Sequence, residues 1–283
     1  MKKLILQNTS FRYLEQSFKE WLDVLGYAES TVYGLPLHVR ELLHYLEEIG
    51  IKNINQLQPE HLKAHYNRLS QRSNNRNYGA LSKSHLNKHI QAMRKFSEYL
   101  RQVGRHEIPD VPLRNEKVSE REPSYLTQEE IKEIFKATER EYPRTTSRFP
   151  EFTEALRSRD KAMLAIFYGC GARKNEGVNL NVEDINWDRK TLHIKKGKRY
   201  KERLVPISKQ ALEHLQEWVY DHRPLWIRSK KIDALFISDR GTRVSGQSLL
   251  LRLKILQDLS KVESLKEKEI GLHSLRHSIA PHL

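Results

Sequence analysis

Gly271-Leu272-His273-Ser274-Leu275-Arg276-His277 stands near the end of this chain, and Gly171-Ala172-Arg173-Lys174-Asn175-Glu176 stands 100 positions before it. Each stretch contains an arginine, Arg173 in one and Arg276 in the other. Arginine carries a fixed charge and a planar set of donors that can bind two oxygens of one phosphate. The two stretches are therefore predicted to form the halves of a single phosphate-binding site.

Two further residues fit phosphoryl-transfer chemistry at such a site. His273 could exchange a proton near neutral pH, and Lys196, in a predicted hairpin beside Gly197, could protonate a leaving oxygen. Each signal alone is weak, because a His-x-x-Arg pattern also occurs on ordinary helix faces. Arg173 could equally do no more than pair with Glu176.

The composition favours a polyanionic partner. The chain has 50 Lys and Arg against 36 Asp and Glu, which gives a net charge of +14. Such a surface attracts nucleic acid with little sequence preference and with strong salt dependence. General solubility is the alternative explanation for the same charge, so composition alone does not decide between the two.

Length and cysteine content narrow the class of protein. A chain of 283 residues suggests about two domains. The single Cys170 follows an apolar stretch, which predicts a packing role rather than a disulfide or a nucleophile and fits a reducing compartment. The N-terminus lacks the apolar run of a signal peptide, and no run approaches the roughly 20 apolar residues of a membrane span. We expect a soluble, cytoplasmic protein.

Apolar periodicity divides the chain into two domains. Residues 1–107 show helical spacing of apolar residues and predict a helical domain, with helices at about 10–25, 30–50, 59–69 and 82–103. Pro36 is expected to kink or delay the second of these helices. The last helix carries basic residues that are candidates for DNA contact: Lys83, Lys88, Arg94 and Lys95. Residues 108–124 are rich in proline and charge and predict a linker.

Residues 125–283 predict a mixed domain of helices with a small antiparallel β-sheet. A capping box at Thr127 begins its first helix. We expect a polar surface loop at 140–158, strands at 191–195, 203–207 and 235–238, and helices at 159–168, 208–219, 246–262 and 274–283. The first two strands flank a hairpin with further basic candidates for DNA contact: Lys198, Arg199 and Lys201. The expected fold class is mainly α with a small antiparallel sheet.

Taken in order, these motifs resemble the tyrosine recombinase (phage integrase) family, particularly its Xer-like members. The Arg173 stretch matches the first arginine box of the family, and Val182-Glu183-Asp184-Ile185 matches the sequence that follows it. Lys195-Lys196-Gly197 with residues 201–206 matches the lysine hairpin, and the His273 stretch matches the His-x-x-Arg box. The resemblance implies a helical, SAM-like core-binding domain followed by an α+β catalytic domain.

The resemblance also implies a mechanism. In the family a tyrosine attacks a DNA phosphate and forms a 3′-phosphotyrosine link, which needs neither metal nor cofactor. Arg173 and Arg276 would clamp the phosphate, Lys196 would act as general acid and His273 would assist proton transfer. Glu176 and Asp184 would support Arg173 and its loop. The implied partners are duplex DNA and further copies of the chain in a tetrameric synapse.

The sequence departs from the family pattern in three ways. The hairpin is about two residues longer than usual, so Lys195 and Lys198 compete with Lys196 for the role of acid. Pro281 stands where the family commonly has threonine, and it removes an amide donor from the last turn. No tyrosine follows Tyr220, although the family's nucleophile lies beyond the His-x-x-Arg box. The chain ends within a predicted helix without a capping residue, so we expect a gene fragment or shortened form rather than an evolved terminus.

We therefore expect a site-specific recombinase that binds but does not cleave DNA as it stands. The alternatives are a non-enzymatic DNA-binding regulator, a natural truncated competitor of a full-length recombinase, and a type IB topoisomerase with the same chemistry. We expect the two domains to close around the duplex as a clamp. The target sequence and the choice among integration, resolution and inversion depend on groove contacts and DNA deformability, which the sequence does not reveal.

Overall fold

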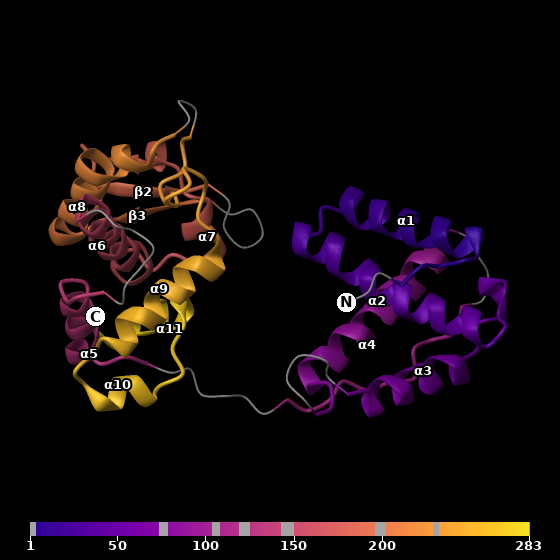
Figure 1. The fold of residues 1–283 in the computed structure, drawn as a ribbon. Helices are drawn as coiled ribbons and strands as arrows, with labels where there is room; N and C mark the ends of the chain where they lie inside the picture. Colours follow the sequence, from indigo (N-terminus) through magenta and orange to yellow (C-terminus); the bar gives the residue numbers. More distant parts are fainter. Residues whose placement is uncertain are drawn as a thin grey trace. The chain divides into compact units, whose positions relative to one another are not determined.

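The chain folds into two compact units, Met1–Glu120 and Arg121–Leu283, in a computed structural model (Figure 1). The structure describes residues 4–73, 79–103, 108–118, 125–142, 150–195, 202–228 and 232–282. The described residues are mostly helical, with one small antiparallel sheet, which confirms the predicted fold class. Among the helices that the structure describes, none is long and apolar enough to cross a membrane.

The first unit is a bundle of four helices: α1 (Thr9–Val24), α2 (Glu29–Glu48), α3 (Pro59–Gln71) and α4 (Lys83–Gln102), with a short 3₁₀ turn η1 (Ile54–Gln56). Side-chain caps fix two of the helix starts. The Asn8 side chain accepts from the backbone of Ser10 and Phe11, and Ser82 accepts from the backbone of His85. Helix α2 packs against both α1 and α4, and α3 packs against α4.

Aromatic rings fill the centre of this bundle. Phe18 of α1 is fully buried and meets Phe96 of α4 edge-on, with the ring centroids 5.4 Å apart. The ring centroid of Tyr99 lies 5.6 Å from that of Phe18. Burying side chains of this size stabilises the unit by about 1.5–3 kcal/mol each. The apolar stripes predicted from the sequence face this core.

Pro36 was expected to kink or delay α2, and the delay is not seen. The helix runs from Glu29 to Glu48 with Pro36 inside it and buried. The neighbouring Leu35 and Val39 lie in the core of the unit. Packing of the apolar face therefore outweighs the loss of one backbone hydrogen bond.

Part of the segment expected as a linker, residues 108–118, packs on the first unit; we call it the 108–118 arm. Ile108 is buried in the helical core, and Arg94 of α4 donates to the backbone oxygen of Leu113 at 2.5 Å. The side chain of Asn87 exchanges two hydrogen bonds with the backbone of Glu116, at 2.7 and 3.0 Å. Residues 108–118 thus lie against α4 rather than running free, because buried apolar and backbone groups hold them there.

The second unit has helices around a three-stranded sheet. Its helices are α5 (Gln128–Ala137), α6 (Pro150–Leu164), α7 (Lys174–Asn179), α8 (Lys209–Gln216), α9 (Gly246–Asp258), α10 (Glu263–Glu267) and α11 (Leu272–His277). Shorter helical turns are η2 (Ala165–Gly169), η3 (Val182–Asp184), η5 (Glu217–His222), η6 (Arg223–Trp226) and η7 (Ala280–His282). The strands β1 (Ile185–Asn186), β2 (Thr191–Ile194) and β3 (Arg203–Pro206) pair antiparallel in that order.

Three predictions for this unit were wrong. Residues 150–158 belong to α6 and not to a surface loop, because their apolar side chains Phe152 and Ala155 pack on the core. The expected strand at 235–238 is replaced by isolated bridges, Ile237 with Arg243 and Ala234 with Asn181. The expected helix from 274 to the end stops at His277, and Pro281 falls in the separate turn η7.

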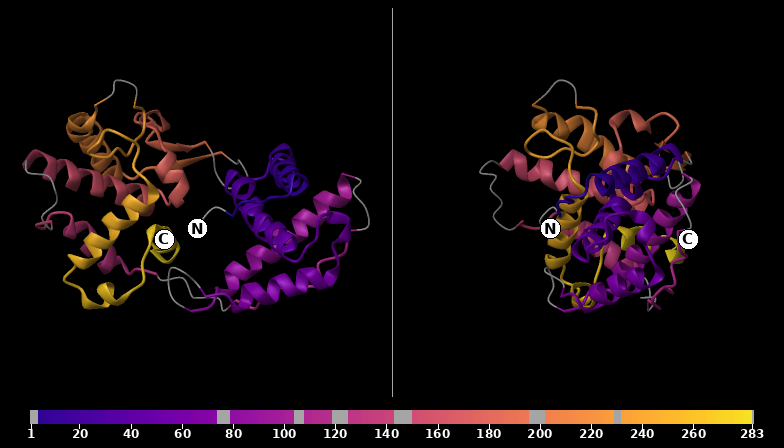
Figure 2. Two further views of the ribbon diagram at one scale, coloured as in Figure 1. Left: turned by 45° about the vertical axis from the view of Figure 1, so that its right-hand side comes forward. Right: turned by 90° about the vertical axis from the view of Figure 1, so that its right-hand side faces the viewer.

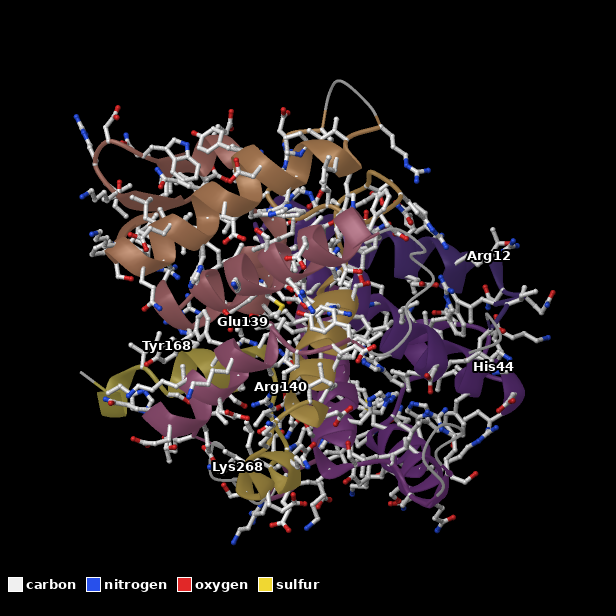
Figure 3. The ribbon with its side chains drawn as sticks, turned by 60° about the vertical axis from the view of Figure 1, so that its left-hand side comes forward. Arg12, His44, Glu139, Arg140, Tyr168 and Lys268 are labelled. Atoms are coloured by element: carbon white, nitrogen blue, oxygen red, sulfur yellow. The ribbon has the colours of Figure 1, made fainter. Side chains whose placement is uncertain are left out.

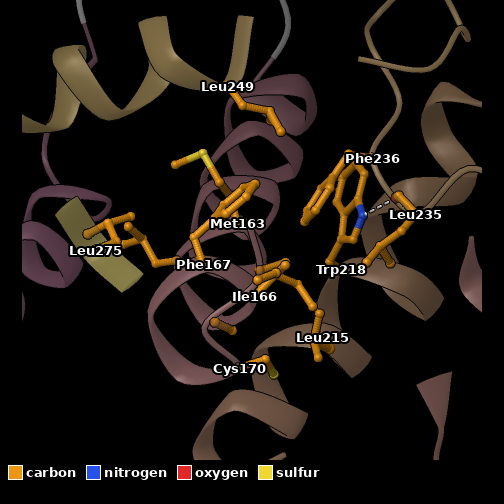
Figure 4. Close-up of a cluster of buried hydrophobic side chains, with 14 of the residues drawn as sticks. Met163, Ile166, Phe167, Cys170, Leu215, Trp218, Leu235, Phe236, Leu249 and Leu275 are labelled. Atoms are coloured by element: carbon orange, nitrogen blue, oxygen red, sulfur yellow. Dashed lines mark hydrogen bonds between the residues drawn. The ribbon is translucent and has the colours of Figure 1, made fainter. Parts of the chain in front are cut away.

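The core of the second unit forms around α6 and η2 (Figure 4). Met163, Ile166 and Phe167 are fully buried there, and Trp218 donates its ring N–H to the backbone oxygen of Leu235 at 2.8 Å. This bond satisfies the polar atom of a fully buried indole. Cys170 lies in the same core with a pKa that burial raises to about 12, which fits the expected packing role.

Helix α9 contacts α5, α10 and α11, and the yellow end of the chain, which contains α9, α10 and α11, is gathered in one part of the second unit (Figure 2). Lys268 pairs with Glu130 of α5 at 2.7 Å, and Arg140 donates to the backbone oxygen of Leu259 and to Glu133 (Figure 3). The hydroxyl of Ser278 accepts from the backbone of Leu126. These contacts hold the last helices in place, and α11 contacts η2, which leads into the Gly171 turn.

Candidate active site

A glycine turn positions Arg173. Helix α6 continues into η2, which ends at Gly169, and Gly171 then adopts φ +58, a conformation that favours glycine. A Cβ at Gly171 would lie 2.9 Å from Ile279 and 3.8 Å from Nη1 of Arg276. The turn therefore places the Arg173 loop directly beside the segment that carries Arg276.

Glu176 fixes the orientation of Arg173. The backbone N–H of Arg173 donates to Oε2 of Glu176 at 2.8 Å, and its Nη1 donates to Oε1 at 2.8 Å. This arrangement closes the first turn of α7. The Arg173 side chain remains 38 % exposed while that of Glu176 is 4 % exposed, so the arginine can still reach an outside ligand.

Arg203 binds the same carboxylate from the sheet. Its Nη1 lies 3.0 Å from Oε1 and its Nη2 lies 2.6 Å from Oε2 of Glu176, a bidentate pair. Burial alone would raise the pKa of Glu176, but hydrogen bonds from Arg203 and Arg173 outweigh burial and hold that pKa at about 2. One carboxylate thereby connects β3 to the start of α7.

Arg276 joins these residues from α11. Its guanidinium donates to the backbone oxygen of Gly171. Burial lowers the pKa of Arg276, and the positive charges of Arg173 and Arg203 lower it further. The three guanidinium groups are therefore close enough to repel one another. An arginine remains protonated even so.

His273 lies one helical turn before Arg276 and faces the same charges. Desolvation lowers its pKa, and the charges of His277, Arg276, Lys174 and Arg173 lower it further. Both effects favour the neutral imidazole in the absence of a ligand. A neutral imidazole can accept or donate a proton when an anion arrives.

The predicted site residues Arg173, His273 and Arg276 thus come together although about 100 positions separate the two stretches. Arg173 and Arg203 pair with Glu176, and Arg276 lies close enough to feel these charges. Among the described residues, the site therefore carries more positive than negative charge. The partly exposed guanidinium groups can bind a phosphate that brings its own negative charge. The arrangement supports stabilisation of a phosphoryl group with a histidine in reach for proton transfer.

Arg203 is the site residue that sequence reasoning did not single out. It stood in the matched segment 201–206 but received no role there. Its position at the start of β3 and the register of Arg203 opposite Ile194 bring it to Glu176. Nothing in the spacing of Glu176 and Arg203, 27 positions apart, would have paired them.

Asp184 contacts the lysine hairpin rather than Arg173. Lys195 lies 2.8 Å from Oδ1 of Asp184 and 2.8 Å from Oε1 of Glu183. The ion pairs with Asp184 and Glu183 raise the pKa of Lys195. The other oxygen of Asp184 accepts from the backbone of Asn181 at 2.8 Å. The support expected from Asp184 for Arg173 is therefore corrected: it holds Lys195.

The remaining hairpin residues lie outside the described part of the chain: Lys196, Lys198, Arg199 and Lys201. The structure thus leaves the roles of Lys196 as acid and of the others as DNA contacts as predictions. Lys195 pairs with two carboxylates, which makes it a weaker candidate for the acid.

The basic residues of α4 divide into two kinds. Lys83 and Lys88 are exposed. Arg94 instead holds the 108–118 arm through Leu113 and Asn115, and Lys95 pairs with Glu98 at 2.6 Å. Lys83 and Lys88 are consequently the better candidates for phosphate contact on this helix.

Comparison with known proteins agrees with the geometry. The sequence profile of the phage integrase family matches residues 124–283, more than half of the chain. The chain belongs to the phage integrase family. As a member of this family of tyrosine recombinases it resembles the Xer-type proteins. Tyrosine recombinase XerD of Proteus mirabilis is 31 % identical over 195 residues, which cover 69 % of this chain and only 57 % of that protein's length.

Two further relatives extend the resemblance of this phage integrase family member. Tyrosine recombinase XerD of Pasteurella multocida (strain Pm70) is 29 % identical over 257 residues, covering 90 % of this chain and 78 % of the relative. A crystal structure of the XerH site-specific recombinase bound to a palindromic difH substrate, a post-cleavage complex, superimposes with a TM-score of 0.68 at 19 % identity. It covers 97 % of this chain and 73 % of that one. The fold of both units is therefore that of a tyrosine recombinase.

Proposed function

We propose that the chain is the DNA-binding and phosphate-binding part of a site-specific recombinase, a protein that breaks and rejoins DNA through a 3′-phosphotyrosine. The observation that carries this proposal is the convergence of Arg173, Arg203, His273 and Arg276 on one site, in a chain of the phage integrase family. A regulator that only binds DNA has no need of a histidine among three arginines. The excess positive charge suits a phosphate in a pentacoordinate transition state.

In this proposal Arg173 and Arg276 bind the nonbridging oxygens of the scissile phosphate. Arg203 and Glu176 act as positioning residues, because Glu176 orients Arg173 while Arg203 neutralises the buried carboxylate. His273, neutral before DNA binds, exchanges a proton at the phosphate. Lys196 protonates the 5′-oxygen as it leaves, and the phosphotyrosine conserves the energy of the broken ester.

The nucleophile is proposed to lie outside these 283 residues. No tyrosine follows Tyr220 in the sequence. Two described tyrosines of the second unit have other contacts: Tyr142 is bonded to Asp160 at 2.9 Å, and the hydroxyl of Tyr168 bonds His282 at 3.0 Å. Burial raises the pKa of both hydroxyls, which opposes their action as nucleophiles. The 283 residues alone are therefore expected to bind DNA without cleaving it.

The proposed partners are duplex DNA and other copies of the recombinase. The XerH neighbour is described as bound to its DNA substrate, and a lambda integrase neighbour as a tetramer bound to a Holliday junction. By analogy we propose that both units contact duplex DNA and that four copies assemble on paired sites. Exposed Lys83 and Lys88 would contribute phosphate contacts from the first unit.

A covalent-trapping experiment tests the function. The chain is used to select its site from a random pool of duplexes, and the selected site is then nicked so that the cleaved strand diffuses away. A version extended by a tyrosine-bearing C-terminal segment from a family member should form a covalent adduct that survives denaturation. Arg276→Gln should abolish the adduct, whereas Arg240→Gln, which removes an exposed charge elsewhere in the unit, should retain it.

Three results would count against parts of this proposal. An extended chain that binds its site yet forms no adduct would contradict recombinase chemistry. An adduct unaffected by Arg276→Gln would contradict the assigned phosphate site. An adduct formed by the 283 residues alone would show that they contain the nucleophile, and Tyr200 in the hairpin would be the first residue to replace. A topoisomerase would relax supercoils without paired sites, which a plasmid assay distinguishes.

A further inference from the structure

Three histidines from two helices of the first unit lie side by side. His38 stands on α2, and His85 and His89 stand one turn apart on α4. The ring centroids are 4.2 Å apart for His38 and His89, 5.1 Å for His85 and His89, and 5.3 Å for His38 and His85. Each ring offers one nitrogen such that all three nitrogens lie within 4.8 Å of one another.

The nitrogens in this cluster lack protein partners. Within the described ranges neither ring nitrogen of His89 has a hydrogen-bond partner, and Nδ1 of His38 has none. His89 is only 1 % exposed. Buried polar atoms are nearly always paired in folded proteins, so unpaired nitrogens this close to one another require an explanation. A shared ion that accepts a lone pair from each ring would explain why these nitrogens have no protein partner.

We propose that His38, His85 and His89 bind one Zn²⁺ ion that links α2 to α4. Neutral imidazole is a preferred ligand for zinc, and two histidines at i and i+4 on one helix face present their rings to one ion. Three protein nitrogens leave the fourth tetrahedral position to water. A ligand set made only of imidazoles favours zinc. Iron–sulfur clusters are bound by thiolates and calcium by oxygen ligands, and the cluster offers neither.

The surroundings keep these imidazoles in the form that binds metal. His89 is buried, and burial favours an uncharged ring whose nitrogen keeps a free lone pair. Arg72 and Lys88 add positive charge nearby, and this charge opposes a bound cation. Glu41, which is buried and paired with Arg72 at 2.8 Å, offsets part of it.

The helices need little movement to complete the site. Zinc bound to nitrogen at about 2.0–2.1 Å in a tetrahedron places its ligands about 3.4 Å apart. The three nitrogens, which lie within 4.8 Å of one another, therefore have to approach by roughly 1 Å or slightly more. His85 is half-buried and stands in the first turn of α4, so its side chain can adjust most easily.

A zinc ion here would act on stability and not on phosphoryl transfer. It would link His38 of α2 to His85 of α4, two helices that already pack against each other in the first unit. The phosphate site of the second unit uses none of these residues. The DNA chemistry is still expected to need no metal. The proposed zinc ion stabilises the helical unit only.

Cobalt substitution tests the site in the full chain. Metal-free protein is titrated with Co²⁺, which gives visible absorption bands when tetrahedrally bound, and Zn²⁺ is then added to displace it. One Co²⁺ per chain should bind and be displaced by one Zn²⁺. The thermal midpoint should rise with Zn²⁺ and fall on addition of a chelator.

Variants identify the ligands. His85→Gln and His89→Gln should each weaken Zn²⁺ binding by more than about 100-fold, beyond the roughly 10–100-fold cost of losing an outer hydrogen-bond partner. His44→Gln is the matched control, since His44 stands on α2 beside Glu48 and outside the cluster (Figure 3). His65→Gln removes another buried histidine, whose ring lies 6.4 Å from that of His89 but outside the triplet, and should retain binding.

Each outcome decides for or against the site. Loss of tetrahedral Co²⁺ absorption in His85→Gln, with circular dichroism unchanged and His44→Gln binding normally, supports it. Because His85 is half-buried, this variant decides the case even if His89→Gln fails to fold. Failure of the parent chain to bind Co²⁺ or Zn²⁺ at one per chain would overturn the proposal. Unchanged affinity in His85→Gln, or loss of binding in His65→Gln or His44→Gln, would overturn the assigned ligands.

Discussion

Arg203 and Glu176 form a bidentate ion pair, with nitrogen–oxygen distances of 3.0 and 2.6 Å, and the same carboxylate holds Arg173. The pair connects the small sheet to the turn that presents Arg173. A buried carboxylate between two arginines fixes the position of Arg173, which we propose binds the phosphate, while the carboxylate itself stays away from the ligand. The rigidity of the site therefore depends on a residue that performs no chemistry.

We expect Glu176→Gln to destabilise the second unit by about 1–3 kcal/mol. The amide retains one acceptor oxygen, so one guanidinium loses its partner and faces an NH₂ group. Urea unfolding at pH 7 measures the change. Glu263→Gln is the control, because its pair with Lys266 spans 3.3 Å on the surface and the Glu263 side chain is 76 % exposed. Equal midpoints for the two variants would contradict the role given to Glu176.

The contribution of Glu176 should disappear in acid. Its pKa of about 2 in the folded chain lies below the ordinary value of 4.5, so its ionised form stabilises the fold fully above about pH 4.5. The contribution is lost as the pH falls toward 2. The difference in urea midpoint between wild type and Glu176→Gln should be large at about pH 6 and shrink steadily below about pH 4.5. A difference independent of pH would show that packing, not charge, makes Glu176 important.

Two helical glycines should respond oppositely to alanine. A Cβ added at Gly34 of α2 would have nothing within 4 Å, so Gly34→Ala should stabilise by about 0.5–1 kcal/mol. At Gly177 of α7 the added Cβ would lie 2.6 Å from the buried ring of Phe167, so Gly177→Ala should cost about 1–3 kcal/mol. Thermal unfolding measures whether each variant is more or less stable than the parent chain. Stabilisation by both changes would mean that α7 can move away from Phe167.

The sequence predicted local features better than distant contacts. Caps, apolar stripes and the boxes around Arg173 and Arg276 were visible because they depend on neighbours within a few residues. The pairing of Arg203 with Glu176 depends on how strands and helices pack, which no short spacing encodes, and the same holds for the three clustered histidines. Two expectations drawn from prolines were not met: Pro36 does not delay the start of α2, and Pro150 begins α6 instead of lying in a surface loop. In both helices the neighbouring apolar residues pack on the core.

Replacement of hairpin lysines should separate the general acid from its neighbour. In a version extended by a tyrosine-bearing segment, Lys196→Met should lower cleavage by about 10²–10⁴-fold. Lys195→Met should lower it less, since Lys195 lies 2.8 Å from both Glu183 and Asp184. A substrate with a 5′-sulfur leaving group needs no proton and should rescue Lys196→Met. Rescue of Lys195→Met instead would assign the acid to Lys195.

Binding of DNA should raise the pKa of His273. In the free chain, burial and then the charges of His277, Arg276, Lys174 and Arg173 hold this pKa below 6.5. A phosphate between the arginines brings negative charge near the ring, which favours the protonated form, by about one pH unit or more for a charge within roughly 4–6 Å. The group then takes up a proton on binding, so DNA affinity should strengthen as the pH falls through the two pKa values.

NMR titration of the His273 ring, assigned by its loss in His273→Gln, measures the pKa directly with and without a short duplex at low salt. Arg276→Gln provides the control, because removing that charge should raise the pKa of His273 in the free chain. The change on DNA binding should then be smaller, because the phosphate loses one of the two arginines proposed to hold it beside the ring. A pKa that is the same in free and bound protein would place the phosphate away from His273 and leave this histidine without a part in the chemistry.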